Sequence, residues 1–204
     1  MIPDSYFDRF ETPKYKERST LKRGLIKRFV ERFHSLFLRA NPVESVLEVG
    51  MGEGFLSGYL SERFPHIRFE GLDTDAGQLA LAGKLFPKIK THHGTIYELK
   101  ERVGEFDLVL CCEVLEHLSD PEKALDEIVA LKPKFVLFTV PHEPFFMLSN
   151  LFRGRNITRL GNDIDHHNHW GKKAFEQLLS SRFDIVELTT SYPFLLALAV
   201  PRAR

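Results

Sequence analysis

The 204-residue sequence has little cysteine, no excess charge of either sign and no long apolar segment. Its two cysteines, Cys111 and Cys112, are neighbours and cannot form a useful cross-link, which excludes a disulfide framework. The N-terminus shows no basic start followed by an apolar run, so no secretory signal is recognised. The longest apolar run, residues 194–200, is too short to cross a bilayer. We therefore expect a cytoplasmic protein without a transmembrane segment, although peripheral membrane contact stays open.

Lysine plus arginine and aspartate plus glutamate number 28 each, so the formal net charge is zero. A balanced chain has no overall field that attracts nucleic acid. DNA binding is not expected, and the lack of a recognisable RNA-binding module argues against RNA binding. Residues 14–39 are locally basic, which indicates either the solvated face of a helix or a basic binding surface. The length and the 43% hydrophobic content predict a single globular domain.

Apolar patterns alternate between strand-like and helix-like segments along the chain. A helix is predicted to end near Ala40, and a continuously apolar strand covers residues 134–140. The other predicted strands cover residues 45–49, 68–72, 88–92 and 106–111, and the other helices 55–64, 76–86 and 121–131. This alternation predicts an α/β, Rossmann-like doubly wound sheet, mostly parallel, with helices on both faces.

The most informative stretch, residues 47–55, reads L-E-V-G-M-G-E-G-F, a strand that leads through glycines into a helix. Glycines there allow positive φ and let a ligand lie against bare backbone near the helix N-terminus. A dinucleotide site needs glycines at the first, third and sixth positions, but Phe55 occupies the sixth. Glu48 and Glu53 favour a cationic ligand over a pyrophosphate. Asp73, about twenty residues later at a strand end, is suited to ribose hydroxyls. S-adenosylmethionine has the required positive charge and sugar.

These motifs, together with F-E-G-L-D-T-D, E-F-D-L-V-L-C-C-E-V-L-E-H-L and D-P-E-K-A-L-D-E-I, resemble class I S-adenosylmethionine-dependent methyltransferases. The resemblance covers residues 43–140 best and is closest to the quinone-biosynthesis-like branch. It implies a seven-stranded sheet with an antiparallel last strand, the final two strands falling in residues 183–190 and 193–200. It divides the domain 1–204 into a helical cap (1–42), a donor-binding core (43–140), an acceptor-side insertion (141–170) and a C-terminal helix with two strands (171–204).

The resemblance also implies roles for individual residues. It places the methyl donor, with S-adenosylhomocysteine as product, against twelve residues of the core. These are Glu48, Gly50, Met51, Gly52, Gly54, Asp73, Thr74, Thr95, Ile96, Cys112, Glu113 and Val114. Relatives often have an acidic residue against adenine where this chain has Gly94-Thr95-Ile96, so Thr95 bonding the amino group and Ile96 stacking on the ring are both open.

Histidines dominate the expected acceptor side. His117 either faces the transferred methyl group or ties its loop to the following helix, and His169 is the second catalytic candidate. We expect His142, His166, His167 and Trp170 to contact the acceptor. His167 and His169 are close enough to share a zinc ion. No metal is expected, because structural zinc sites usually draw on a second knuckle or helix and no cysteine pair lies nearby.

The resemblance implies a methyltransferase acting on oxygen, nitrogen or carbon of a small-molecule acceptor, with a saccharide or a lipid-linked metabolite as the candidates. Residues 144–152 form either a core helix or a lid over a bulky acceptor, with Arg153 and Arg155 meeting phosphate. A non-catalytic donor-binding protein, a nucleotide-linked oxidoreductase and an RNA methyltransferase are the alternatives. A monomer and a homodimer are equally compatible with the sequence.

Overall fold

The computed structural model describes residues 2–16, 19–152 and 165–202. Seven strands form one sheet in the order β3-β2-β1-β4-β5-β7-β6, and β7 is antiparallel to both of its neighbours whereas the other pairings are parallel. The strands are β1 Ser45–Val49, β2 Arg68–Asp73, β3 Lys90–His93, β4 Leu108–Cys112, β5 Phe135–Pro141, β6 Phe183–Ser191 and β7 Phe194–Pro201. The expected fold is therefore confirmed, including its antiparallel last strand.

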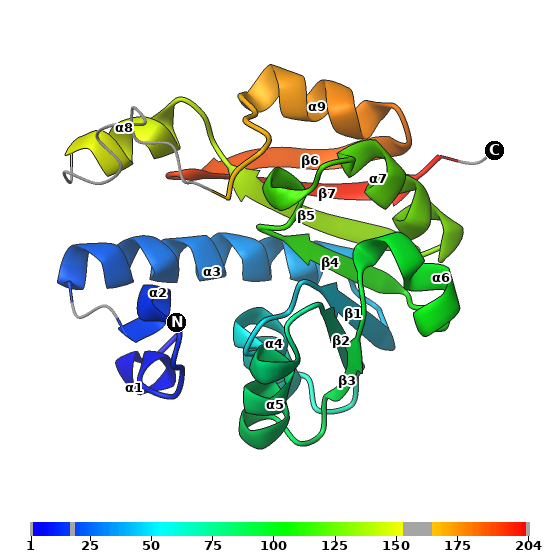
Figure 1. The fold of residues 1–204 in the computed structure, drawn as a ribbon, viewed down its shortest axis with the longest axis horizontal. Helices are drawn as coiled ribbons and strands as arrows, with labels where there is room; N and C mark the ends of the chain where they lie inside the picture. Colours follow the sequence, from blue (N-terminus) through cyan, green and yellow to red (C-terminus); the bar gives the residue numbers. More distant parts are fainter. Residues whose placement is uncertain (1, 17–18, 153–164, 203–204) are drawn as a thin grey trace.

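Helices cover both faces of this sheet (Figure 1). One face packs on α3 Thr20–Ala40, α4 Phe55–Arg63 and α5 Ala76–Leu85, and the other on α6 Leu99–Arg102, α7 Pro121–Ala130 and α9 Lys172–Ser180. Short turns of 3₁₀ helix, η1 Ile96–Glu98 and η2 Leu115–His117, precede α6 and α7. Because both faces are covered, all five residues of β4 are buried, which explains its continuous apolar sequence.

Element boundaries follow local chemistry where the pattern is strong. Asp120 caps α7 by accepting the backbone N–H of Lys123, and Pro121 takes the first helical position. The weak third strand is shorter than predicted and lies at the sheet edge, where none of its four residues is fully buried. An edge strand has only one neighbour and little core contact, so its sequence carries a weak apolar signal.

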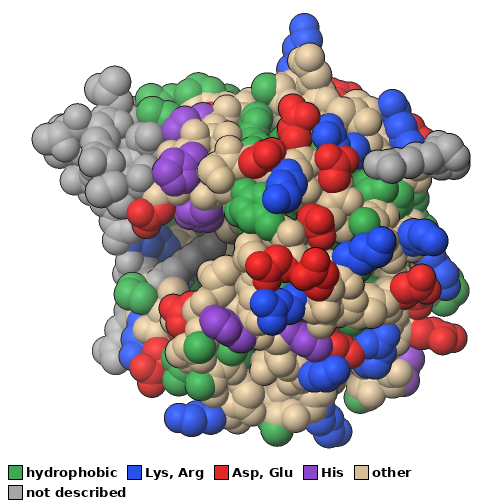
Figure 2. All heavy atoms as spheres, turned by 45° about the vertical axis from the view of Figure 1, so that its right-hand side comes forward, with side chains coloured by type: hydrophobic (Ala, Val, Ile, Leu, Met, Phe, Trp, Pro, Cys, Tyr) green, Lys and Arg blue, Asp and Glu red, His purple; other side chains and the backbone are tan. Residues whose placement is uncertain are grey.

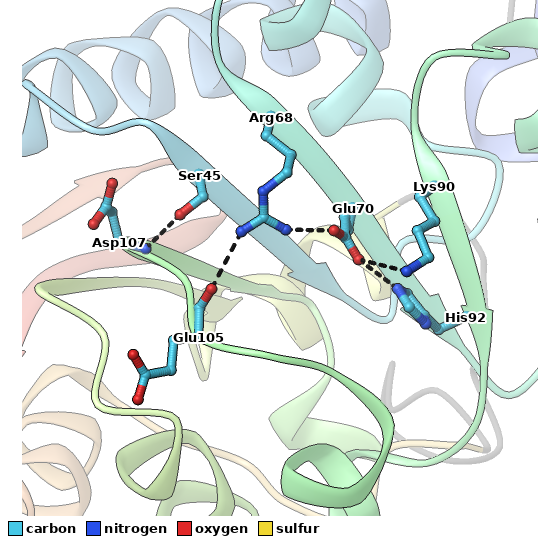
Figure 3. A network of polar contacts seen from close by, with 7 residues as sticks. All are labelled: Ser45, Arg68, Glu70, Lys90, His92, Glu105 and Asp107. Atoms are coloured by element: carbon cyan, nitrogen blue, oxygen red, sulfur yellow. Dashed lines mark hydrogen bonds and ion pairs between the residues drawn. The ribbon is translucent and has the colours of Figure 1, made fainter.

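Chain order reverses between β1 and β4, so the carboxyl ends of these strands open a crevice of the kind that binds ligands in doubly wound sheets. At the opposite end a polar network ties the strands together (Figure 3). Glu70 accepts hydrogen bonds from Arg68 and His92, with a 2.6 Å distance to His92 Nε2. Burial opposes ionisation of Glu70, but these two hydrogen bonds outweigh it and leave its pKa lowered. The network stabilises the end of the sheet away from the crevice.

Two short N-terminal helices, α1 Asp4–Phe7 and α2 Pro13–Lys16, lie beside α3 and α4 (Figure 1). Phe7 and Phe10 are fully buried in the same core as α3 and α4, and the Tyr6 hydroxyl donates to the carbonyl of Phe55 at 2.8 Å. We call residues 2–16 the N-terminal arm. Its aromatic side chains pack on the first helix after the glycine loop, so the arm reaches the crevice.

The helix α8, Phe145–Phe152, follows β5 and confirms a helix in this segment. It extends past the end of the sheet, over the N-terminal half of α3 (Figure 1). Phe146 packs against the core, whereas Phe145 and Leu148 are exposed. Arg153 and Arg155 lie outside the described residues. None of the helices that are described is long and apolar enough to cross a membrane.

Candidate functional site

The loop between β1 and α4 has a conformation that only glycine adopts easily. Gly50 and Gly54 have φ angles of 69° and 79°, and Gly54 is the N-cap of α4. A Cβ on Gly50 would lie 2.4 Å from Cγ2 of Val114, so backbone and side chain meet here without space for a methyl group. The N–H groups of Gly50 and Met51 both donate to the carbonyl of Leu72, which joins the loop to the end of β2.

Two carboxylates flank this loop. Asp73 accepts the backbone N–H of Gly52 at 2.7 Å, so the residue at the end of β2 also shapes the glycine loop. Glu48 is 4% exposed and accepts the N–H of Ser57 at 2.9 Å, near the start of α4. Burial raises the pKa of Glu48 to about 7, against its hydrogen bonds with Ser57. A carboxyl group held in this way gains its charge readily when a cationic ligand arrives.

A pocket of about 210 Å³ lies against the loop and is called the glycine-loop pocket below. Its lining residues are Thr12, Tyr15, Ile26, Phe29, Glu48, Gly50, Met51, Gly52, Glu53, Phe55, Leu56, Gln78, Cys112, Glu113 and Phe194. Its volume is below the roughly 300–1,000 Å³ typical of small-molecule sites. Tyr15 stacks on Phe55 with ring centroids 4.0 Å apart, so the N-terminal arm closes one side of the pocket.

The arm is fastened to the loop by Glu53, which is only 3% exposed. Its carboxylate accepts the backbone N–H groups of Glu11 and Thr12, each at 2.6 Å, and the Thr12 hydroxyl. Hydrogen bonds to an ionised carboxylate are among the stronger ones in proteins. Burial, and then the charge of Glu48, raises the pKa of Tyr15, so its hydroxyl stays protonated on the pocket side of the arm.

The segment after β4 connects the glycine-loop pocket with a second group of residues. Glu113 has a φ of 57°, which is unfavourable for a residue with a side chain, and its Oε1 accepts the Thr139 hydroxyl at 3.0 Å. Such backbone outliers persist where the surrounding structure holds them, and they gather at functional sites. Cys111 and Cys112 are both buried, and burial raises the pKa of each thiol, so neither is a reactive thiolate.

The second group consists of Glu116, His117, Glu143, His166 and His169, which we call the histidine cluster. Its members come from η2, from the end of β5 and from the segment before α9. The rings of His117 and His166 meet edge to face at 4.8 Å, and His169 Nδ1 lies 3.8 Å from Glu143 Oε1. Figure 2 shows several histidine side chains gathered at the upper left of this face of the molecule.

The remaining residues expected on the acceptor side lie around the cluster. His142 forms an isolated bridge with Trp170, and its ring contacts Phe145 of α8 at 4.8 Å. Burial, and then the charge of Lys172, lowers the pKa of His142, which favours its neutral form. Trp170 packs against the core beside Phe175 of α9.

The structure changes the assignment of metal-capable residues. His167 is exposed and belongs to neither group of side chains with metal-ligand spacing among the described residues. Those groups are Glu116 with His117 and His166, and Glu143 with His166 and His169; the ligand atoms of each lie within 4.8 Å of one another. Among the described residues, His167 and His169, which the sequence places close enough to share an ion, therefore do not belong to a common group of this kind. An extended segment can place the rings of His167 and His169 on one side. Here the backbone N–H of His167 donates a hydrogen bond to the carbonyl of Glu116 at 2.8 Å instead.

Comparison with known proteins fits this geometry. A family model described as methyltransferase domain matches residues 46–134. The chain is thus similar to methyltransferases over the part that holds the glycine loop and Asp73. The mitochondrial ubiquinone biosynthesis O-methyltransferase of Saccharomyces cerevisiae is 30% identical over 64% of this chain and 44% of its own length. The trans-aconitate 2-methyltransferase of Deinococcus radiodurans is 30% identical over 76% of this chain and 64% of its own. The chain thus spans less than two thirds of these relatives.

Solved structures share the fold of this chain. Magnesium protoporphyrin IX methyltransferase from Synechocystis PCC 6803, solved with S-adenosylhomocysteine bound, superposes with a TM-score of 0.70 at 16% identity. The match covers 97% of this chain and 95% of that one. At this identity the similarity establishes the fold, and the chemistry must be argued from the residues themselves.

Six of the expected donor residues line the glycine-loop pocket: Glu48, Gly50, Met51, Gly52, Cys112 and Glu113. Thr74 and Thr95 lie near Asp73 at the same edge of the sheet. The His93 ring forms a hydrogen bond with the carbonyl of Thr74, and the N–H of Gly94 donates to the carbonyl of Asp73. Ile96 is 4% exposed and packs in the core beside η1. Residues that the sequence did not indicate include Thr12, Tyr15 and Phe194 in the pocket, and Glu116 and Glu143 in the cluster.

Proposed function

We propose that this protein transfers a methyl group from S-adenosylmethionine to an oxygen, nitrogen or carbon atom of a small-molecule acceptor. The observation that carries the proposal is the joint placement of the glycine loop, the buried Glu48 and Asp73 at one edge of the sheet. Open backbone lies between two carboxylates, and none of the described residues that line the pocket carries a cationic side chain to receive a phosphate. This arrangement suits a cationic amino-acid nucleoside better than a dinucleotide.

On this proposal Asp73 accepts hydrogen bonds from the ribose hydroxyls, and Glu48 faces the ammonium end of the donor. Gly50, Met51, Gly52 and Gly54 supply the backbone surface. Thr74, Thr95 and Ile96 border the adenosine, and Cys112, Glu113 and Val114 line the opposite wall. The sulfonium is already a good leaving group, so the protein mainly aligns donor and acceptor and excludes water. The N-terminal arm suits the second task, because Tyr15 and Thr12 cover the pocket.

The histidine cluster is proposed to serve the acceptor, with His117 and His169 nearest the chemistry and His142, His166, His167 and Trp170 contacting the substrate. Exposed Phe145 and Leu148 on α8 add an apolar surface next to His142. An apolar lid beside polar groups suits a saccharide or lipid-linked acceptor with an oxygen to be methylated. Vesicles of neutral and anionic lipid test this part: equal, negligible binding by wild type and a Phe145→Ser, Leu148→Ser variant excludes a membrane-held acceptor.

The donor assignment is tested by calorimetry with S-adenosylhomocysteine. Wild type should bind one equivalent, and Asp73→Ala should bind about 10- to 100-fold more weakly, because a charged hydrogen-bond acceptor is lost. Asp184→Ala, which removes an exposed carboxylate paired with Arg202 far from the crevice, is the matched control. Binding of a nicotinamide dinucleotide in place of S-adenosylhomocysteine would reject the proposal.

Catalysis is tested separately from binding, with radiolabelled methyl donor and pools of small-molecule acceptors. Label transfer that depends on Asp73 supports the enzyme. Tight binding without transfer to any acceptor class, together with regulation of donor affinity by a second protein, would favour a donor-binding protein without catalysis.

A further inference from the structure

Three ligand-type side chains converge beside the glycine-loop pocket from two distant parts of the chain. Glu116 and His117 lie in η2, and His166 lies about fifty residues later, before α9. One potential ligand atom from each lies within 4.8 Å of the other two. We propose that Glu116, His117 and His166 bind a divalent transition-metal ion. Its function at the acceptor side rests on the proposed methyl transfer, but its binding does not.

The His117 ring is already oriented for this role. Its Nδ1 lies 2.9 Å from the backbone carbonyl of Asp165. A carbonyl can only accept, so Nδ1 carries a proton, and Nε2 is the ring nitrogen left to bind an ion. A second ring nitrogen fixed by a backbone carbonyl is the usual support of a metal-bound histidine, because it sets both tautomer and ring direction.

Backbone contacts hold the two ligand segments in register. The N–H groups of His167 and Asn168 donate to the carbonyl of Glu116 at 2.8 and 3.1 Å. The Asn168 side-chain amide donates to the carbonyls of Leu115 and Leu118, at 3.3 and 2.7 Å. Hydrogen bonds of the neighbouring residues therefore hold His166 next to η2, and they do not use the His166 ring. Little rearrangement is needed to form the site, which lowers the entropic cost of binding.

The donor set also indicates the kind of ion. Two imidazoles and one carboxylate suit zinc, manganese or iron, whereas magnesium and calcium prefer oxygen ligands. Three protein ligands leave at least one coordination position for another molecule, as in catalytic zinc sites. Glu116 is only 1% exposed, and a cation beside it offsets the cost of burying a charged carboxylate.

Glu143 and His169 form the neighbouring group and share His166. Glu143 Oε2 accepts the backbone N–H of Met147 at 3.1 Å, so one carboxylate oxygen supports α8. The Glu143 carboxylate is thus already used to support α8. In our proposal Glu143 and His169 lie next to the ion but do not bind it. If the methyl group is transferred to an acceptor oxygen, that oxygen could occupy the free coordination position of the ion and be polarised there.

The test is calorimetric titration of the full chain, stripped with chelator and dialysed, with ZnCl₂, MnCl₂ and MgCl₂ in separate runs. We expect one equivalent of zinc or manganese to bind, and magnesium to bind at least 10-fold more weakly. Glu116→Gln and His166→Ala should each weaken binding at least 10-fold. His66→Ala, which removes an exposed histidine away from the cluster, is the matched control and should leave it unchanged.

Binding that persists in both Glu116→Gln and His166→Ala, or absence of zinc and manganese binding by wild type, overturns the proposal. Loss of binding in Glu143→Gln and His169→Ala but not in Glu116→Gln would also overturn it, because the ion would then belong to the other group. Thermal unfolding of each variant identifies any that fail to fold; His117→Ala then replaces that variant. S-adenosylhomocysteine binding is measured on the same samples. Normal donor binding without metal rejects only the metal site, and metal binding without donor binding rejects only the proposed function.

Discussion

Glu48 makes stability and ligand binding depend on pH in opposite directions. Its side chain is 4% exposed, and burial raises its pKa from an ordinary 4.5 to about 7. The folded protein therefore keeps this proton at a pH where the unfolded chain has lost it. Stability is lost as the pH rises from about 4.5 to about 7 and is constant above that range. The full effect is about 3 kcal/mol, because each pKa unit corresponds to about 1.4 kcal/mol.

The substitution Glu48→Gln removes this titration and keeps an acceptor for the Ser57 N–H. Relative to wild type, we expect the variant to gain about 2 kcal/mol in the free energy of unfolding between pH 5.5 and pH 8. Urea unfolding of the ligand-free proteins at these two pH values measures the change. Glu176→Gln, on the exposed side of α9, is the control and should show no such gain.

Ligand binding should show the reverse trend. A ligand with an ammonium group favours the ionised carboxylate, so wild-type affinity for S-adenosylhomocysteine should rise from pH 6 to pH 8 and binding should release protons below pH 7. Calorimetry in buffers of different ionisation enthalpy counts those protons. A stability difference between Glu48→Gln and wild type that does not change with pH would refute the reasoning, because it would place the pKa of Glu48 near its ordinary value.

Three further outcomes follow from the site. Gly71→Ala places a Cβ 1.9 Å from the Met51 sulfur, so overpacking should cost about 1–3 kcal/mol in urea unfolding and weaken S-adenosylhomocysteine binding in calorimetry; unchanged values would contradict the close contact. Glu53→Ala removes the acceptor that fastens the N-terminal arm, so trypsin should cut the arm faster while far-UV circular dichroism stays native; an equal rate of cutting would show that aromatic packing alone holds it. His169→Ala should lower turnover in a labelled-methyl assay and leave S-adenosylhomocysteine affinity unchanged; loss of donor affinity would place His169 on the donor side instead.

The donor half of the site could be recognised because its signals are local. Gly50 and Gly54 need positive φ, and the strand before them and the helix after them are visible in apolar periodicity. Asp73 follows a strand whose end must meet the loop when the two strands are parallel neighbours. The edge strand was placed less accurately, since Lys90–His93 makes few core contacts that could shape its sequence.

The acceptor half depends on contacts between segments that no local pattern joins. Tyr15 reaches the glycine-loop pocket only because aromatic residues of the N-terminal arm pack on Phe55, and nothing in the arm's own sequence indicates that position. His166 reaches Glu116 and His117 through backbone bonds across about fifty residues, whereas the sequence showed only that His167 and His169 are close enough to share an ion.

The sequence by itself determined the alternation of strands and helices, the glycine loop and the carboxylate after β2, because turn chemistry and apolar periodicity act over a few residues. Only the tertiary structure decided which side chains close the pocket and which histidines lie together. Those choices are made by packing of distant segments, where a shift of one residue exchanges a buried ring for an exposed one.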